Sequence, residues 1–318
     1  MGTVSNIDPA PEAINLKPGI VQAVDVVEAR KASIGDGAEV RRLLPQRTLR
    51  TIGAWCFLDH YGPDEVSRGP GMRVPPHPHI GLQTVTWLLD GEVEHDDSLG
   101  NQSLLRPDGV NVMTSGGGIA HAEQTPRDHS GRLNGVQLWT ALPDDVRDSA
   151  AGFAHVERVP SIESRGGIAR IFAGALGGAA SPAPYFSPIV GADLLIHAGH
   201  TLPLPLDPAF EHAVLVLDGE VSLDGQPLAP RMLHYLGVAR SHADFVSGTG
   251  GRVLLIGGAP FEEKILMWWN FVARTPEEIA AARADWESHR RFGDVTHYRG
   301  ERLEAPKLVQ AARPTLMS

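Results

Sequence analysis

Residues 76–123 read PHPHIGLQTVTWLLDGEVEHDDSLGNQSLLRPDGVNVMTSGGGIAHAE, and two pairs of metal-ligand side chains stand near the ends of this stretch. His77 and His79 form the first pair, and His121 and Glu123 form the second. Residues i and i+2 of a β-strand face the same side, with Cα atoms roughly 6.6 Å apart. Two such pairs on neighbouring strands can direct four ligands at one point, which predicts a metal site.

The second pair gives this prediction most of its weight. With 14 histidines in 318 residues, one His-x-His pair is weak by itself. His121-x-Glu123 follows a glycine-rich bend at residues 115–118, and the segment between the pairs has the pattern of strand, turn and strand. Three imidazoles and a carboxylate suit a divalent first-row metal better than Mg²⁺ or Ca²⁺, which prefer oxygen ligands. Iron, manganese, nickel, copper, cobalt and zinc all remain compatible.

The segments 77–95 and 106–123 resemble the pirin family of the cupin superfamily, with further likeness at residues 137–139 and 270–279. The resemblance implies an all-β bicupin, with two tandem β-sandwich or β-barrel (jelly-roll) domains. It also implies one divalent transition metal in the first domain, held by residues matching His77, His79, His121 and Glu123. Iron(II) is the expected metal, with manganese, nickel, cobalt, copper or zinc as alternatives.

Two functions follow from the resemblance. The first is that of a quercetin 2,3-dioxygenase, which cleaves a flavonol with O₂; Glu123 would then be both a ligand and the catalytic base. The alternative is a metal-dependent regulatory protein that binds a transcription factor or a metabolic enzyme. Pirins usually have Glu where this chain has Gln83, and strand parity from His79 places Gln83 on the ligand face. A neutral amide there favours regulation relative to catalysis.

Composition and charge restrict the other possibilities. The formal net charge is −10 and the sequence has no Lys/Arg cluster beyond pairs, which argues against direct nucleic-acid binding. No run approaches 18 apolar residues and the N-terminus lacks a signal-peptide pattern, so we expect no membrane segment and a cytoplasmic protein. The single cysteine, Cys56, lies in an apolar run and is expected to be a small core residue.

The chain divides into four predicted parts. Residues 1–19 form a polar, proline-rich tail, residues 20–150 the metal-binding domain, residues 151–275 a second cupin domain without metal, and residues 276–318 a helix and an arm. Alternation predicts strands at residues 20–27 and 39–44, and a short apolar run predicts one at residues 54–58. Residues 82–89 are apolar on both faces, and Asp90-Gly91 predicts a hairpin turn into residues 92–95.

An internal repeat supports the two-domain prediction. Residues 216–221, VLDGEV, match residues 88–93, LLDGEV, at an offset of 128 residues. The same offset places Pro205 and Asp207 where His77 and His79 stand, so the second copy is expected to lack the metal. Scattered histidines such as His200, His212, His234 and His242 are expected to be surface or hydrogen-bonded residues.

Two further predictions concern single segments. Thr275, Pro276 and Glu278 form a helix start, Ile279, Ala282 and Trp286 line one face, and Gly293 can end the helix. His95 is either an exposed turn residue, which the sequence favours, or a residue that orients a metal ligand.

Overall fold

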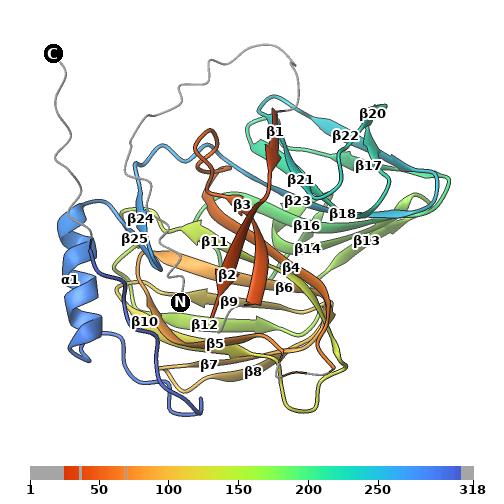
Figure 1. Cartoon of the computed structure of the whole chain (residues 1–318). Helices are drawn as coiled ribbons and strands as arrows, with labels where there is room; N and C mark the ends of the chain where they lie inside the picture. The colour runs from red at the N-terminus through yellow and green to blue at the C-terminus, as the bar shows by residue number, and fades with distance from the viewer. Residues whose placement is uncertain (1–24, 36–37, 68, 70, 309–318) are drawn as a thin grey trace, which may run out of the picture.

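The computed structural model describes residues 25–35, 38–67, 69 and 71–308, and β-strands dominate them (Figure 1). One helix, α1 (Pro276–Glu287), follows the last strand. The predicted all-β fold with a C-terminal helix is confirmed. The predicted tail at residues 1–19, the beginning of the first predicted strand and the end of the arm lie outside the described residues.

The first half contains a seven-stranded antiparallel sheet, which we call the first inner sheet. Its order is β12 (Gly152–Val156), β9 (Val110–Thr114), β6 (Leu82–Gly91), β11 (Arg132–Ala141), β4 (Trp55–Glu65), β3 (Ala38–Leu44) and β2 (Arg30–Ile34). A four-stranded outer sheet packs against it, in the order β5 (Arg73–His79), β10 (Ile119–Gln124), β7 (Val93–Asp97) and β8 (Gln102–Leu105). Together these sheets form the first barrel.

The second half repeats this arrangement. Its inner sheet has the order β1 (Asp25–Glu28), β21 (Met232–Gly237), β18 (Glu211–Gly219), β23 (Gly251–Gly258), β16 (Ile189–Ile196), β14 (Gly167–Leu176) and β13 (Ser161–Ser164), with β15 (Ala179–Ala180) beside β14. Its outer sheet consists of β17 (His200–Pro205), β22 (His242–Ser247), β19 (Ser222–Leu223) and β20 (Gln226–Pro227). β18 lies between β21 and β23 as β6 lies between β9 and β11, as the sequence repeat predicts.

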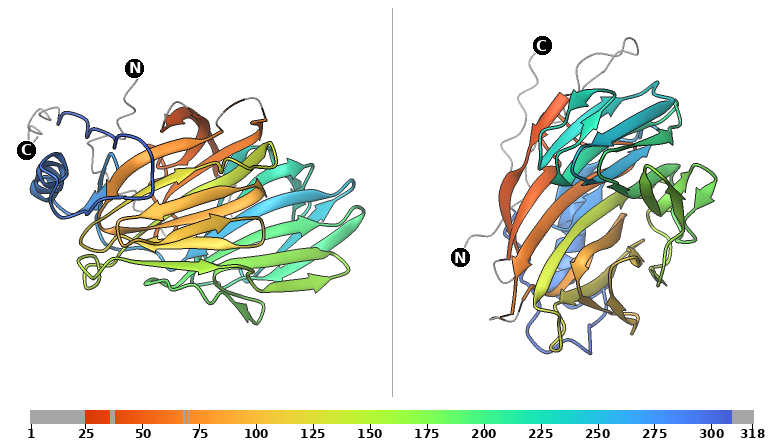
Figure 2. Two further views of the ribbon diagram at one scale, coloured as in Figure 1. Left: turned by 90° about the horizontal axis from the view of Figure 1, so that it is seen from below. Right: turned by 90° about the vertical axis from the view of Figure 1, so that its right-hand side faces the viewer.

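The largest apolar core lies between the two inner sheets and joins the barrels. Trp55 of β4 is fully buried there, and its indole Nε1 donates to the carbonyls of Val190 and Gly257 in the second half, at 3.2 and 3.0 Å. The Trp87 and Phe172 rings stack across the same core with centroids 5.2 Å apart. Figure 2 shows the strands of the two halves in stacked layers. The barrels are therefore held together by burial of apolar surface.

The structure corrects the predicted hairpin after β6. Residues 93–97 form β7, which pairs with β8 and β10 in the outer sheet, whereas β6 pairs with β9 and β11 in the inner sheet. Gly91, with φ of 89°, stands at the point where the chain passes from one sheet to the other. A turn signal in the sequence does not specify which strand the next segment will pair with.

Two strands also cross the predicted domain boundary. β1, which the sequence assigns to the first domain, pairs with β21 of the second inner sheet. β12, assigned to the second domain, pairs with β9 of the first. Each barrel is thus completed by a strand from the other side of the predicted division at residue 150.

The C-terminal segment packs on the first barrel. Thr275 caps α1 through its Oγ1, which accepts from the Glu278 N–H at 3.2 Å, and Ile279, Ala282 and Trp286 are buried, as predicted. α1 ends at Glu287, before Gly293. Beyond it the arm contacts the edge strand β5, where the Leu303 N–H donates to the Pro76 carbonyl at 2.9 Å. Among the described residues, no helix has the length and apolar character to span a membrane.

Candidate metal centre

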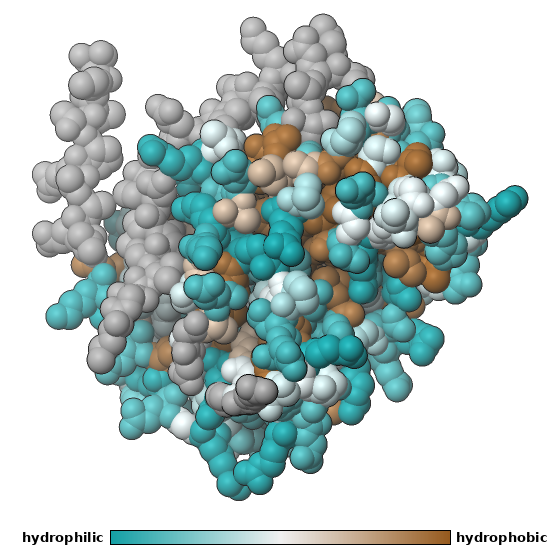
Figure 3. Space-filling model, turned by 45° about the vertical axis from the view of Figure 1, so that its right-hand side comes forward, coloured by the Kyte–Doolittle hydropathy of each residue, from teal (hydrophilic) through white to brown (hydrophobic). Residues whose placement is uncertain are grey.

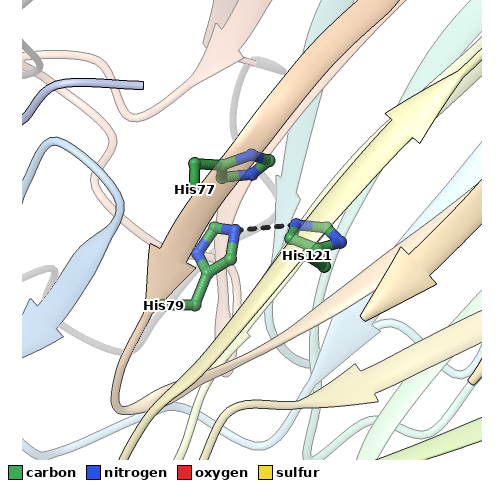
Figure 4. A group of neighbouring side chains, drawn as sticks. All are labelled: His77, His79 and His121. Atoms are coloured by element: carbon green, nitrogen blue, oxygen red, sulfur yellow. Dashed lines mark hydrogen bonds between the residues drawn. The ribbon is translucent and has the colours of Figure 1, made fainter. Parts of the chain in front are cut away.

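Three histidines from two neighbouring strands meet inside the first barrel. His77 and His79 extend from β5 and His121 from β10, and His121 lies directly opposite His77 in the strand register. The His79 and His121 Nε2 atoms are 3.0 Å apart, and Figure 4 shows these two rings facing each other with His77 beside them. Two nitrogens bound to one metal at right angles, at about 2.1 Å each, would lie about 3.0 Å apart. The spacing fits a shared metal ion.

The Nδ1 atoms of His77 and His79 each lie beside a backbone carbonyl. His77 Nδ1 lies 2.9 Å from the Pro75 carbonyl, and His79 Nδ1 lies 3.0 Å from the Asn270 carbonyl. Because a carbonyl only accepts, each Nδ1 carries the proton and each Nε2 keeps its lone pair for a metal. The turn between β24 (Leu266–Trp268) and β25 (Phe271–Ala273) therefore helps to orient a ligand of the first barrel.

Burial keeps these imidazoles neutral. The three side chains have between 1% and 6% of their surface exposed. Desolvation lowers the pKa of His77 to about 4 and holds the pKa values of His79 and His121 well below their usual range. Neutral imidazole is the form that binds metals, so the donor set fits a divalent transition metal.

Glu123 lies beside this group rather than within it. The β5–β10 register shifts between His121 and Glu123, and the Glu123 carboxylate groups with His95 and His121. Its Oε1 accepts a hydrogen bond from the Thr86 hydroxyl at 3.0 Å. Burial raises the pKa of Glu123, although His95 and the Thr86 hydrogen bond act in the opposite direction. The predicted four residues are neighbours, and the carboxylate is turned toward Thr86.

His95 is a buried neighbour of the centre, which corrects the favoured expectation of an exposed turn residue. It is 2% exposed on β7, and its Nδ1 lies 3.3 Å from His121 Nδ1, while its Nε2 lies 3.4 Å from Asp97 Oδ2. His121 Nδ1–H can therefore donate to His95, which in turn donates Nε2–H to Asp97. Burial opposes ionisation of Asp97, but hydrogen bonds from His95 and Asn101 outweigh it and lower the pKa of Asp97.

We expect His95→Gln to weaken metal binding without unfolding the protein. The change removes the acceptor that fixes the His121 tautomer, and losses of such supporting groups commonly reduce metal affinity by about 10- to 100-fold. The measurement is competition with a chelator of known affinity, beside circular dichroism. His155→Gln, at an exposed histidine on β12 outside the triad, is the control. Unchanged metal affinity in His95→Gln would contradict this role.

Gln83 does not face the three histidines, contrary to the parity prediction. Its Nε2 donates to Thr114 Oγ1 at 2.9 Å and to the Pro184 carbonyl of the second half at 3.0 Å. The alternation of side-chain directions does not continue from His79 to Gln83, because β5 ends at His79 and β6 begins at Leu82. Gly81 between them has φ of 68°, and a Cβ there would lie 2.1 Å from the Val272 carbonyl oxygen. Gln83, which stands where pirins usually have Glu, therefore contacts the second half of the chain.

Other residues singled out in the sequence have structural roles. Cys56 is fully buried, and burial raises the pKa of its thiol to about 12, as expected of a core residue. His212 and His234 are buried in the second half, and His234 Nε2 lies 3.0 Å from the Ala229 carbonyl, as expected of a hydrogen-bonded histidine. His242 lies near Asp224 and Asp244, but Asp224 is already paired with Arg240 at 2.5 Å and the group is on the surface.

Comparison with known proteins agrees with this arrangement. The pirin family profile matches residues 37–140, and the profile of the pirin C-terminal cupin domain matches residues 191–293. The chain belongs to the pirin family. A Pseudomonas aeruginosa pirin-type protein named "putative quercetin 2,3-dioxygenase" is 48% identical over 283 residues, which cover 89% of this chain and 90% of that protein. A pirin-like protein of Caulobacter vibrioides is 36% identical, over 89% and 99% of the two chains.

Solved structures share the fold. A crystal structure described as quercetin 2,3-dioxygenase from Acinetobacter baumannii has a TM-score of 0.87 and 42% identity, and the match covers 91% of this chain and 97% of that one. A bacterial pirin from Escherichia coli, solved in complex with nickel(II), has a TM-score of 0.59 and 15% identity, covering 75% and 100%. The two-barrel pirin architecture is therefore common to these chains.

Removing the metal is expected to leave the pirin fold intact. The barrels have apolar cores of their own and share a third between them, so none depends on the metal. Loss of a ligand that binds only the folded state costs RT ln(1 + [M]/Kd), about 3 to 4 kcal/mol at 100- to 1,000-fold excess over Kd. Circular dichroism and chemical denaturation of chelated protein measure this. Loss of the β signal on chelation would instead indicate a structural metal.

Proposed function

We propose that this pirin is a metal-dependent dioxygenase that cleaves flavonols such as quercetin. The observation that carries the proposal is the group of three neutral histidines whose Nε2 atoms remain available, with a buried carboxylate beside them. Relatives of high identity bear the name quercetin 2,3-dioxygenase, which supports the same reaction class. Iron(II) is our first choice of metal, with nickel, manganese, cobalt, copper and zinc as alternatives.

In this proposal His77, His79 and His121 hold the metal, and Glu123 acts on the substrate proton. The metal, when bound, supplies Lewis acidity toward the 3-hydroxyl group of the flavonol and the capacity to react with O₂. Glu123 accepts the 3-hydroxyl proton on its carboxylate, while the Thr86 hydroxyl keeps that side chain oriented. The products are carbon monoxide and the ring-opened ester, which keeps both atoms of O₂ and the other carbon atoms. The proton that Glu123 accepted passes to the new carboxylate group of that ester.

The surroundings of the triad are suited to excluding water. Trp139 packs edge-on to the His79 ring with centroids 5.2 Å apart and stacks on Phe57 at 4.0 Å. The arm around Leu303 pairs with β5 next to His77, through the Leu303 N–H and the Pro76 carbonyl. A dry apolar environment strengthens the electrostatic effect of a carboxylate on the proton that it accepts.

The experiment is simultaneous measurement of O₂ uptake and carbon monoxide release with quercetin. Metal-free protein is reconstituted separately with iron, nickel, manganese, cobalt and copper, and each sample is compared with the same metal without protein. The proposal expects equal amounts of O₂ consumed and carbon monoxide released with at least one metal. No turnover above the metal-only samples would reject it.

Glu123→Gln is expected to lower kcat by about 100-fold or more, because it removes the base while nearly preserving shape. It also removes the negative charge beside the metal, so activity must be compared at equal metal content. Glu94→Gln, on β7, is the matched control, since Glu94 contacts Gln124 and not the histidines. Equal kcat values for Glu123→Gln and wild type would exclude Glu123 as the base.

A metal-dependent regulatory protein is the second candidate. The low exposure of the three histidines favours it, because a closed site can respond to metal loading without admitting a large substrate. Retention of a partner from the native cell only by the metal-loaded form, with no flavonol turnover, would support this candidate. Figure 3 shows hydrophobic residues in separate patches on one face, between hydrophilic ones.

A further inference from the structure

Inside the first barrel, a threonine of the inner sheet holds the carboxylate of Glu123. Glu123 is on β10 and Thr86 is on β6, and the Thr86 hydroxyl donates to Glu123 Oε1 at 3.0 Å. Both side chains are buried, with 6% and 2% of their surface exposed. A hydrogen bond to a carboxylate is strong in such surroundings, so this contact fixes the direction of the Glu123 side chain.

Gln137 completes this group and determines where the threonine proton points. It lies directly opposite Thr86 in the register of β6 and β11, and its amide oxygen is 3.0 Å from Thr86 Oγ1. A hydroxyl has one hydrogen, so Thr86 cannot donate to Glu123 and to Gln137 at once. A carboxylate only accepts, whereas an amide presents an N–H after a half-turn of its end. The consistent arrangement is a chain in which Gln137 donates to Thr86 and Thr86 donates to Glu123.

The strand register keeps Glu123 apart from the three histidines. Two residues separate His121 from Glu123 on β10, but three separate their partners, His77 and Val74, on β5. The donor nitrogens of His77, His79 and His121 lie within 4.8 Å of one another, and Glu123 is not a member of that group. Ligands at about 2.1 Å from one metal lie no more than about 4.2 Å apart. Glu123 must therefore move before it can bind the same metal.

We propose that Thr86 and Gln137 are positioning residues that hold Glu123 off the metal. The Thr86 hydroxyl and the metal compete for one carboxylate, and the hydrogen bond decides whether Glu123 stays free or becomes a fourth ligand. Gln137 strengthens the hydroxyl in this competition by fixing the direction of its proton. The role of the free carboxylate as a base rests on the proposed function, whereas the competition for the carboxylate does not.

Thr86→Val tests the competition, because valine has nearly the same shape and lacks the hydroxyl. The metal-free, full-length variant is titrated with cobalt(II) in competition with a chelator, beside circular dichroism. The affinity for cobalt(II) is expected to rise by about 10- to 100-fold. At 1.4 kcal/mol for each tenfold change this is about 1.4–2.8 kcal/mol, the range for a hydrogen bond to a charged group. Weaker or unchanged binding would overturn the proposal, since a residue that only supports a bound ligand lowers metal affinity when it is removed.

Three further proteins assign the gain to Glu123. In the double variant Thr86→Val with Glu123→Gln the gain should vanish, so that its affinity equals that of Glu123→Gln alone; a persisting gain would overturn the proposal. Gln137→Leu should raise the affinity in the same direction by a smaller factor, and this result does not depend on how Thr86→Val folds. Thr140→Val is the control, because Thr140 is also 2% exposed but donates to the uncharged Gln83 amide at 3.4 Å.

Flavonol turnover separates this proposal from the proposed function. At equal metal content, kcat of Thr86→Val is expected to fall by about 10-fold or more, because most of its Glu123 is then bound to the metal. Absence of turnover in the wild type would reject the dioxygenase, and the cobalt(II) affinities would still decide the competition. Tighter cobalt(II) binding with an unchanged kcat would support the competition and exclude Glu123 as the base.

Discussion

His79→Ala is expected to lose its metal while keeping its β structure. The change removes one of three nitrogens whose lone pairs converge, and the ring is 1% exposed, so a water molecule has little access to replace it. Loss of a group that only supports a ligand already costs about 10- to 100-fold in affinity, and loss of the ligand itself should exceed about 100-fold. Elemental analysis after dialysis against a chelator, beside circular dichroism, makes the measurement.

His212→Ala is the matched control for that experiment. It also removes a buried histidine, but from the second barrel, where the repeat places no His-x-His pair. Metal content should remain that of the wild type. A full metal complement in His79→Ala, or metal loss in His212→Ala, would mean that the ligand set is wrong.

Trp55→Ala is expected to lower the free energy of unfolding by about 3–5 kcal/mol, the range for truncating a large buried aromatic side chain. Trp55 is fully buried between the inner sheets and donates to two carbonyls of the second half. Its loss would create a cavity in the core that joins the barrels and leave those carbonyls without this donor. Urea denaturation followed by circular dichroism gives the value.

Phe186→Ala is the comparison for this stability experiment. Phe186 is an aromatic residue of the second half with 42% of its surface exposed, so its truncation should change stability by less than about 0.5 kcal/mol. A similarly small effect of Trp55→Ala would show that the barrels do not depend on the shared core.

The sequence was sufficient to predict that His77, His79 and His121 lie together, because two local patterns carried the information. Alternation put His77 and His79 on one face of a strand, and the second pair, His121 and Glu123, followed the glycine-rich bend on what was expected to be a neighbouring strand. Alternation failed at Gln83 because Gly81, at positive φ, separates two strands and restarts the pattern. It could not show His95 either, because the burial of His95 depends on pairing between β7 and β10.

Long-range pairing accounts for the other differences. The turn at Gly91 was recognisable, but its sequence does not say whether the next strand stays in the inner sheet or enters the outer one. The exchange of β1 and β12 across the domain boundary depends on contacts between residues 38 to 46 positions apart for β12 and 204 to 210 positions apart for β1. Local propensity carries no information at those separations.

X-ray absorption spectroscopy of the metal-reconstituted protein tests the central claim most directly, because it reports the atoms bound to the metal. We predict a coordination shell of nitrogen and oxygen atoms with the scattering pattern of three imidazoles. A shell that contains sulfur, or one without histidine imidazoles, would contradict the assignment of His77, His79 and His121 as the metal ligands.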